Sequence, residues 1–505
     1  MNYRNGLYRI FLLALLFLLG THTLRAQDPQ QPQDPQQPQP QDPQQPQPQE
    51  PQQPWDNAPP KPAGSGLPPF DLEDLLGNPN NLQPDYTPLT SMLNAGLGFP
   101  EVKHSYWVPG VQVGSSAQST LFGGPTPTSG WYATNYVTGN ISLLEAWSRS
   151  QLAINYSGGG ALSTDGAAGN NGFQQLAFAE SFKLDRWIIQ IVDEFSQLPQ
   201  SGFGFGVGAG LGIPGVGGSL GPTIPGVGNN YSPNQSIFSG FGPRYSNAAV
   251  AEATYQLTRR SSITASGSYG ILHFVDSGNI DTNSLFSSLG YNYQLSRKDS
   301  IGFFYEFSSF HFPGNPQAYG VQTASAAYSR KITGRIAFSL YGGPQFTSLR
   351  VPVGTSSSTT NGYASAFLNY AFANGGIGGR YVHGISGGSG VFTGSILDEV
   401  GFTVFRRLTR QWSASAHAGY AHNRNVINAT GPGSNPSYDD WFVGVGINRP
   451  LGRTMTVSLA YSATFQTNNP GCSSPGSPAC GPSATTSGQT VTLNFRWHPR
   501  PFALQ

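Results

Sequence analysis

The chain has 505 residues and a formal net charge of +1, so no excess of positive charge favours nucleic acid as a partner. Only 10% of the residues are charged, yet the mean hydropathy is −0.28, so the chain is neither strongly apolar nor solubilised by charge. After the N-terminal region no run reaches the ~18 apolar residues that a membrane-spanning helix requires. If the chain crosses a membrane, it does so with strands.

Residues 1–26 predict a secretory signal peptide. Arg4 and Arg9 precede an apolar run at 10–19, and cleavage is expected after Ala26. The run is too short to span a bilayer as a helix, and no cysteine follows it that could carry a lipid anchor. We therefore expect an exported protein whose mature chain begins after Ala26.

Residues 27–62 repeat Asp, Pro and Gln with almost no apolar residue, which predicts a disordered Pro/Gln-rich linker. The frequent prolines favour an extended chain that could reach on the order of 100 Å. A solvated tail without a partner and a tether that contacts peptidoglycan or a periplasmic envelope protein are both compatible with this composition. Residues 63–115 predict a periplasmic transitional segment or a small plug against the mouth of the next domain.

Between residues 116 and 498 the chain alternates apolar and polar residues in strand-length runs that are separated by short turns, all of them basic except the one at 373–376. Fifteen of the 21 Lys and Arg residues after position 130 lie in or beside these turns. The turns lie at 148–151, 183–186, 258–261, 296–299, 330–335, 373–376, 407–411 and 449–453. They recur every ~35–42 residues with one doubled gap, so the repeat is strand, longer loop, strand, short turn.

Strands are predicted in pairs around the short turns, with a last strand alone. The predicted strands are 136–147, 151–158, 173–182, 187–196, 247–257, 262–272, 284–295, 300–310, 319–329, 335–346, 362–372, 377–385, 396–406, 411–421, 438–448, 453–465 and 488–498. Because bacterial single-chain barrels have an even number of strands, one more is expected at 104–113 or 115–123. The fold class is therefore all-β, an antiparallel transmembrane β-barrel of about 18 strands, with 16 as the next choice.

Two local features refine this interpretation. Asp193 falls on the apolar side of its strand, and a β-bulge, which shifts the alternation of side chains, is one way to place it on the polar side.

Four tryptophans at the short-turn ends of strands predict an interfacial aromatic belt: Trp147, Trp187, Trp412 and Trp497.

The interior is predicted to be weakly charged. By the alternation, the inward-facing charged residues are Glu252, Glu306, Arg380 and Arg496, with His417. They are either solvated lining or groups that set an ion preference. Two Gly-x-Ser-x-Gly matches, at 217–221 and 384–388, fall in Gly/Ser-rich sequence without the strand-to-helix turn that a catalytic serine requires. No catalytic residue, metal site or cofactor is predicted.

Two loops carry unusual sequences. Residues 202–228 are Gly-rich and repeat Ile-Pro-Gly-Val-Gly, which is compatible with a constriction inside the barrel or with a flexible external loop. Cys472 and Cys480 are the only cysteines and lie in a turn-rich loop of an exported chain, which predicts a disulfide between them.

The signal peptide, basic short turns, alternating strands and aromatic final strand together resemble Gram-negative outer-membrane β-barrel proteins of porin-like architecture. The resemblance covers roughly 116–498 and matches no specific named family. It implies an outer-membrane location with both termini in the periplasm, contact with lipid, passage of small hydrophilic solutes and no enzymatic activity. The alternative is a structural or adhesive barrel with a plugged lumen and exposed loops. The tail at 499–505 departs from the pattern, because such proteins commonly end on an aromatic residue.

Overall fold

The computed structural model describes residues 105–120, 129–164, 171–200, 237, 241–275, 278–350, 357–388, 390–426, 436–469, 484–500 and 502–503. The signal peptide, the Pro/Gln-rich linker, the Gly-rich segment at 202–228 and both Cys472 and Cys480 lie outside the described residues, so what was predicted for them stays a prediction. Among the described residues no helix is long and apolar enough to cross a membrane.

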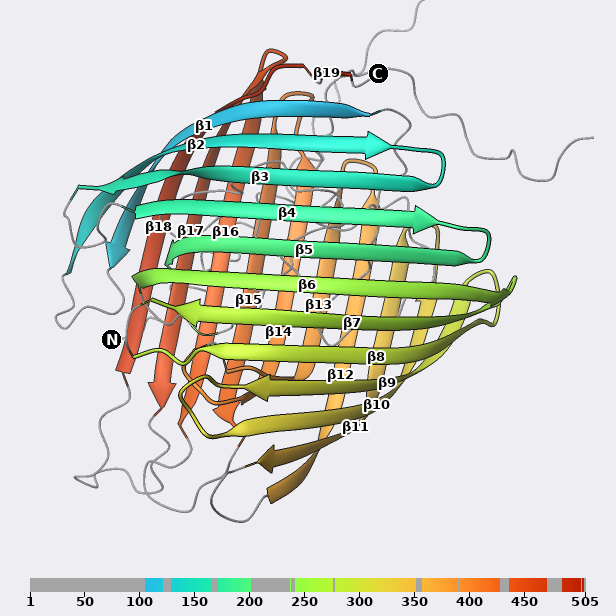
Figure 1. Ribbon diagram of the computed structural model, residues 1–505. Helices are drawn as coiled ribbons and strands as arrows, with labels where there is room; N and C mark the ends of the chain where they lie inside the picture. The colour runs from blue at the N-terminus through green and yellow to red at the C-terminus, as the bar shows by residue number, and fades with distance from the viewer. Residues whose placement is uncertain are drawn as a thin grey trace, which may run out of the picture. The chain divides into compact units, whose positions relative to one another are not determined.

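The described chain forms a closed antiparallel sheet (Figure 1). Strands β1 to β18 each pair with the next strand along the chain, and β18 pairs with β1. The strands are β1 (Tyr106–Thr120), β2 (Ser129–Ala146), β3 (Ser150–Ser163), β4 (Asn171–Lys183), β5 (Trp187–Gln200), β6 (Phe241–Thr258), β7 (Ser261–Phe274), β8 (Thr282–Gln294), β9 (Asp299–His311), β10 (Ala318–Lys331), β11 (Ile336–Arg350), β12 (Ser357–Phe372), β13 (Gly375–Ser386), β14 (Ser395–Arg407), β15 (Ser413–Asn425), β16 (Ser437–Leu451), β17 (Met455–Asn469), β18 (Ala484–Trp497) and β19 (Phe502–Ala503). The predicted barrel of about 18 strands is confirmed.

The strand that the sequence count lacked is β1, which begins at Tyr106 and overlaps both candidate ranges. The barrel therefore starts before residue 116, where the sequence analysis placed its boundary. Each predicted short turn joins two hydrogen-bonded strands, and several strands extend further toward the long loops than expected. For example, β6 begins at Phe241 and not at 247. Polar and glycine-rich ends lack apolar alternation but still form ladder hydrogen bonds, so periodicity underestimates their length.

The two faces of the wall differ as the alternation predicts. On β7, Thr264 and Ser266 are buried while Ile263 and Tyr269 are exposed. On β18, Thr492 and Asn494 are buried while the exposed side chains are Val491, Leu493, Phe495 and Trp497. An apolar outer face and a polar inner face are the pattern of a barrel that spans a membrane.

In several of the short turns, a serine or threonine side chain accepts hydrogen bonds from nearby backbone N–H groups. Ser296 Oγ accepts hydrogen bonds from the backbone N–H groups of Lys298 at 3.0 Å and Asp299 at 3.1 Å. Thr333 and Thr409 accept from the N–H groups two and three residues later, at 3.1–3.2 Å. These bonds satisfy backbone donors that the ladder leaves free at a hairpin end.

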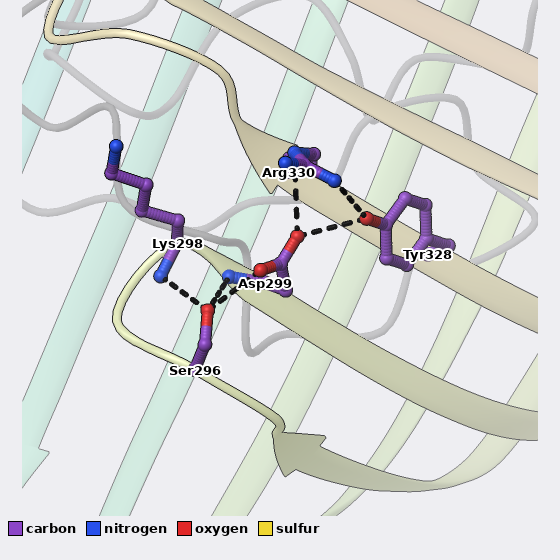
Figure 2. Close-up of polar contacts among 5 residues, drawn as sticks. All are labelled: Ser296, Lys298, Asp299, Tyr328 and Arg330. Carbon is purple, nitrogen blue, oxygen red and sulfur yellow. Dashed lines mark hydrogen bonds and ion pairs between the residues drawn. The ribbon is translucent and has the colours of Figure 1, made fainter.

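Figure 2 shows how one of these turns is tied to the next strand. Ser296 Oγ also donates to Asp299 Oδ2 at 2.6 Å, and Tyr328 OH on β10 donates to Asp299 Oδ1 at 2.8 Å. Arg330 Nε lies 3.5 Å from the same oxygen. The β8–β9 turn and β10 are thus joined by a polar network around one carboxylate.

The C-terminal tail completes the seam of the barrel. The pairing of β18 with β1 ends where Trp497 meets Val111, so β18 leaves the first residues of β1 uncovered. Further along the chain, in the same direction as β18, β19 pairs with Tyr106 and Trp107. The Trp107 and Phe502 rings stack at a centroid distance of 4.9 Å. Because an uncovered strand edge invites aberrant pairing, Phe502 and Ala503 have a structural role in covering the start of β1.

Asp193 lies in β5 without the bulge suggested by the sequence. The register between β5 and β6 is continuous from Trp187 to Leu198, so the prediction of a bulge at Asp193 is wrong. Instead, Asn247 Nδ2 on β6 donates to Asp193 Oδ1 at 3.1 Å. An amide of the neighbouring strand thus engages one oxygen of the carboxylate while the strand pairing stays regular.

Candidate functional site

In the loop between β13 and β14, residues 387–388 and 390–394 fold into the barrel, and we call this segment the tip loop. A Cβ atom added to Gly390 would overlap the Phe274 ring at the end of β7. One added to Gly387 would lie 3.1 Å from Thr282 Cγ2 on β8. Around the wall, β8 and β7 are five and six strands from β13. The tip loop therefore reaches across the interior to a distant part of the wall.

Glycine makes this path possible. Gly388, Gly390 and Gly394 have φ angles of +82°, +80° and +86°. Glycine adopts this left-handed backbone region readily, whereas other residues rarely do. In addition, Gly390 leaves the room that the Phe274 ring occupies. The Gly-rich sequence of the tip loop thus permits both its turns and its close approach to β7.

Hydrogen bonds anchor the tip loop on the distant wall. Ile280 N, in the β7–β8 loop, donates to Gly390 O at 2.8 Å. Thr393 Oγ1 donates to Gln317 Oε1, in the β9–β10 loop, at 2.8 Å. The tip loop is thus bonded to two other loops of the same barrel end.

Aromatic contacts complete the packing of the tip loop. The Phe392 ring meets Tyr438 on β16 edge-on, at 5.4 Å between centroids. A buried apolar cluster fills the same end of the barrel, and its members are Phe310, Phe312, Tyr319, Val321, Leu349, Ile396 and Val426. The tip loop is therefore held by contacts on both sides and narrows the long-loop end of the interior.

Three of the four charged residues predicted to face inward lie in the buried wall. Glu252, Glu306 and Arg380 are 4%, 3% and 4% exposed. The fourth, Arg496, donates through Nε and Nη2 to Gln112 Oε1 at 3.2 and 3.0 Å. His417 is also buried, with its ring 4.6 Å from that of Phe442. That these groups set an ion preference stays a prediction.

Three further charged side chains that were not predicted to face inward are buried: Arg244, Glu399 and Asp440. Glu399 and Asp440 lie within predicted strands, and Asp440 alternates with the buried Gly444 and Gly446, so the alternation could have found them. Arg244 precedes residue 247, the predicted start of its strand, and so it carried no periodicity signal.

These buried charges differ in their partners. Arg380 and Glu399 form an ion pair between Nη2 and Oε1. In contrast, Arg244 Nε and Nη1 and both carboxylate oxygens of Asp440 have no hydrogen-bond partner in the described part of the chain. A buried charge without a partner costs several kcal/mol unless water or a solute reaches it. Arg244 and Asp440 therefore mark the parts of the interior most suited to contact with hydrophilic molecules.

The four predicted belt tryptophans lie at the short-turn end. Trp147, Trp187 and Trp497 are 49%, 44% and 46% exposed. The guanidinium of Arg449 lies 5.1 Å from the centre of the Trp412 ring. Their position at a membrane interface stays a prediction.

The Gly-x-Ser-x-Gly match at 384–388 forms the end of β13 and the start of the tip loop. Ser386 Oγ is 2.7 Å from Ser395 Oγ across the hairpin, and Gly388 N donates to Ser386 Oγ at 3.4 Å. This serine therefore shapes the turn.

Where the chain is described, no group of three or more His, Cys, Asp or Glu residues is arranged to hold a metal ion.

Comparisons with known proteins give low similarities. No model of a protein family matches the sequence, and no curated protein is significantly similar to it. Among solved structures, OpdK of Pseudomonas aeruginosa is 11% identical with a TM-score of 0.39, covering 80% of this chain and 100% of its own. OprD of the same organism is 8% identical with a TM-score of 0.40, covering 82% and 100%. A BenF-like porin of Pseudomonas fluorescens is 10% identical with a TM-score of 0.40, covering 81% and 100%.

Because these TM-scores are low, the fold assignment rests on the strand pairing of this chain. That pairing closes 18 antiparallel strands into a wall that is apolar outside and polar inside. The architecture is that of a Gram-negative outer-membrane, porin-like β-barrel.

Proposed function

We propose that the protein is an outer-membrane channel that passes small hydrophilic solutes and is narrowed at its long-loop end by the tip loop. The tip loop's path across the interior carries this proposal. At a strand spacing of ~4.8 Å and a tilt of ~40°, a round wall of 18 strands has a backbone diameter of ~35 Å. Side chains alone do not close so wide a ring, so an inward loop sets the size of what can pass.

The chemistry of the inner wall supports hydrophilic solutes. On β7 and β8 the buried inward side chains are mostly hydroxyls and amides, such as Ser262, Thr264, Ser288 and Asn292. The described buried charges include both signs, and one pair neutralises itself. Such a surface offers hydrogen bonds to polar molecules and little apolar area.

A plugged structural or adhesive barrel is the second candidate. The observation in its favour is the low exposure of even small inward side chains: Thr264 is 0% and Ser268 7% exposed. A wall shielded in this way is expected where the lumen is filled. The two candidates differ in whether ions cross the purified barrel.

Conductance in planar bilayers separates them. The mature chain, purified in detergent and added to a bilayer in concentrated potassium chloride, is expected to give discrete current steps. Heat-modifiable gel migration of the same preparation shows that the barrel is folded, because a closed barrel has no edge at which to begin unfolding. A folded preparation that gives no steps contradicts the channel and favours the plugged barrel.

We further propose that the short turns face the periplasm, which places both ends of the barrel domain there. In support, β1 begins and β18 ends at the short-turn end. A cysteine introduced at Ser358, near the long-loop end of β12, is expected to react with an impermeant maleimide on intact cells. One introduced at Ser296 or Thr409 is expected to react only after the outer membrane is permeabilised. Labelling of the latter pair on intact cells inverts the orientation.

For the N-terminal region we propose a periplasmic spacer at 27–62 that contacts peptidoglycan or an envelope protein, followed by a transitional segment that leads into β1. Its composition supports an extended chain. Deletion of 27–62 should leave the barrel folded and reduce its sedimentation with purified peptidoglycan. Equal sedimentation of both chains argues against the peptidoglycan contact.

A further inference from the structure

Arg244 stands apart from the other inward-facing arginines. It lies near the start of β6, at the long-loop end, and is 6% exposed. Its Nε and Nη1 atoms have no hydrogen-bond partner among the described residues. The Nε and Nη1 atoms of Arg380 also lack a partner there, but Arg380 has a carboxylate beside it, because its Nη2 is paired with Glu399. Arg496 donates to Gln112. Arg244 thus has a buried guanidinium whose Nε and Nη1 donors no described residue accepts.

The residues paired with Arg244 on the two neighbouring strands offer no carboxylate to it. Its cross-strand neighbours are Leu198 on β5 and Phe274 on β7. The nearby Asp281 already has hydrogen-bond partners. Its Oδ1 accepts a hydrogen bond from Phe274 N at 2.9 Å, and its Oδ2 lies 2.6 Å from His273 Nδ1. Below it on β6, Ser246 Oγ is bonded to Ser196 Oγ at 2.5 Å. Among the described residues, the positive charge of Arg244 therefore has no counter-charge beside it.

The position of Arg244 connects it to the tip loop. Phe274, its partner on β7, is the residue whose ring occupies the space next to Gly390. A solute that passes the tip loop on the β7 side therefore comes close to the Arg244 guanidinium. An arginine stays protonated even when buried, and its planar fork binds carboxylates and phosphates through two parallel hydrogen bonds.

We propose that Arg244 forms a binding subsite for the oxyanion group of small solutes, a carboxylate or a phosphate, beside the tip loop. The proposal rests on the channel function and deepens it, because it names the chemical class of solute that binds at the narrow end of the channel. An oxyanion would supply the hydrogen-bond acceptors that the described residues do not provide. It would also offset the cost of burying an unpaired charge.

The test is the block of potassium chloride current by inorganic phosphate in single barrels. Phosphate should reduce the wild-type current in a concentration-dependent way. Arg244→Gln should raise the half-blocking concentration about tenfold or more, as expected for the loss of a charge-assisted bidentate contact. Arg244→Lys keeps the positive charge but loses the planar guanidinium that forms two parallel hydrogen bonds, so an intermediate half-blocking concentration is expected.

Arg496→Gln is the matched control, because it removes the same charge from the short-turn end, where a glutamine already engages the guanidinium. Its half-blocking concentration should change by less than about twofold, because salt screens the interaction between the distant Arg496 charge and phosphate at the Arg244 subsite. Equal shifts in Arg244→Gln and Arg496→Gln would mean that only the summed charge of the interior matters, which overturns the subsite.

A second measurement keeps the subsite separate from the channel. Phosphate should raise the thermal unfolding temperature of the wild-type barrel in detergent, because a ligand stabilises the state that binds it. Arg244→Gln, shown to be folded by heat-modifiable migration, should lose this shift while Arg496→Gln retains it. A barrel that conducts no ions but shows this pattern refutes the channel and supports the subsite. A conducting barrel in which Arg244→Gln is blocked like the wild type refutes the subsite alone.

Discussion

The two ends of the barrel are built by different means. At the short-turn end, a serine or threonine accepts hydrogen bonds from backbone N–H groups two or three residues later, as at Ser296, Thr333 and Thr409. At the long-loop end, the tip loop is held by residues from strands and loops far away in the sequence, such as Phe274 and Gln317. One end is thus organised by local hydrogen bonds, whereas the other depends on tertiary contacts.

This difference separates stability from function. Each short turn closes one hairpin, so a change there is expected to act mainly on the free energy of unfolding. The tip loop contributes few of the ladder hydrogen bonds, so its removal is expected to change what the interior admits while the wall persists. The changes below, from the largest expected effect to the smallest, test this division.

Replacement of residues 387–394 by Asn-Gly should leave the barrel folded and increase its conductance severalfold, because the hairpin then closes by a two-residue turn. Single-channel current and heat-modifiable migration are the measurements. Gly390→Val is a milder variant: its side chain would collide with the Phe274 ring and strain a left-handed backbone, so the loop must shift. Unchanged conductance in a folded loop replacement would show that the tip loop does not limit passage.

Truncation after His498 removes β19 and the stacking of Phe502 on Trp107. The start of β1 then keeps its pairing with β2 but loses its partner on the other edge, and the free energy of unfolding should fall by about 1–3 kcal/mol. Urea unfolding of the barrel in lipid vesicles, followed by tryptophan fluorescence, measures this loss. Phe502→Ala should account for a large part of it. Equal stability of truncated and complete chains would show that the tail is dispensable for the seam.

Asp299→Ala removes the acceptor shared by Ser296 and Tyr328 at the β8–β9 turn (Figure 2). The network is exposed, so the loss of stability should be about 1 kcal/mol in the same urea assay. Asp185→Ala is the matched control, because Asp185 is exposed in the β4–β5 turn and no described residue bonds to its side chain. It should change stability by less than ~0.5 kcal/mol. Similar losses in both variants would contradict a specific role for the network.

Thr333→Ala should have the smallest effect, a loss of about 0.5–1 kcal/mol, because water can replace the hydroxyl at an exposed turn. Thr333→Ser keeps the oxygen that accepts from Arg335 N and Ile336 N and should be close to wild type. Conductance should be unchanged in both variants. A change in conductance without a change in stability would mean that the short turns also shape the passage.

The sequence alone determined the wall of the barrel. Side chains on a strand alternate between faces with a period of two, so a single sequence reveals which runs separate a polar from an apolar environment. The turn residues act within three positions of one another, and this made all eight short turns recognisable. Boundaries failed where the alternation is weak, as at β1 and at the start of β6, because hydrogen-bond ladders continue through residues without a periodic pattern.

Only the tertiary structure decided how the interior is arranged. Nothing in the sequence near Gly390 indicates that its loop would meet Phe274, because that contact depends on the closure of the whole ring. Similarly, the alternation can place an arginine on the inner face but does not reveal whether a carboxylate on another strand neutralises it. Arg380 has such a partner, and Arg244 has none among the described residues. The pattern along one strand reports its environment, whereas the pairing of charges depends on distances between strands that exist only in the folded barrel.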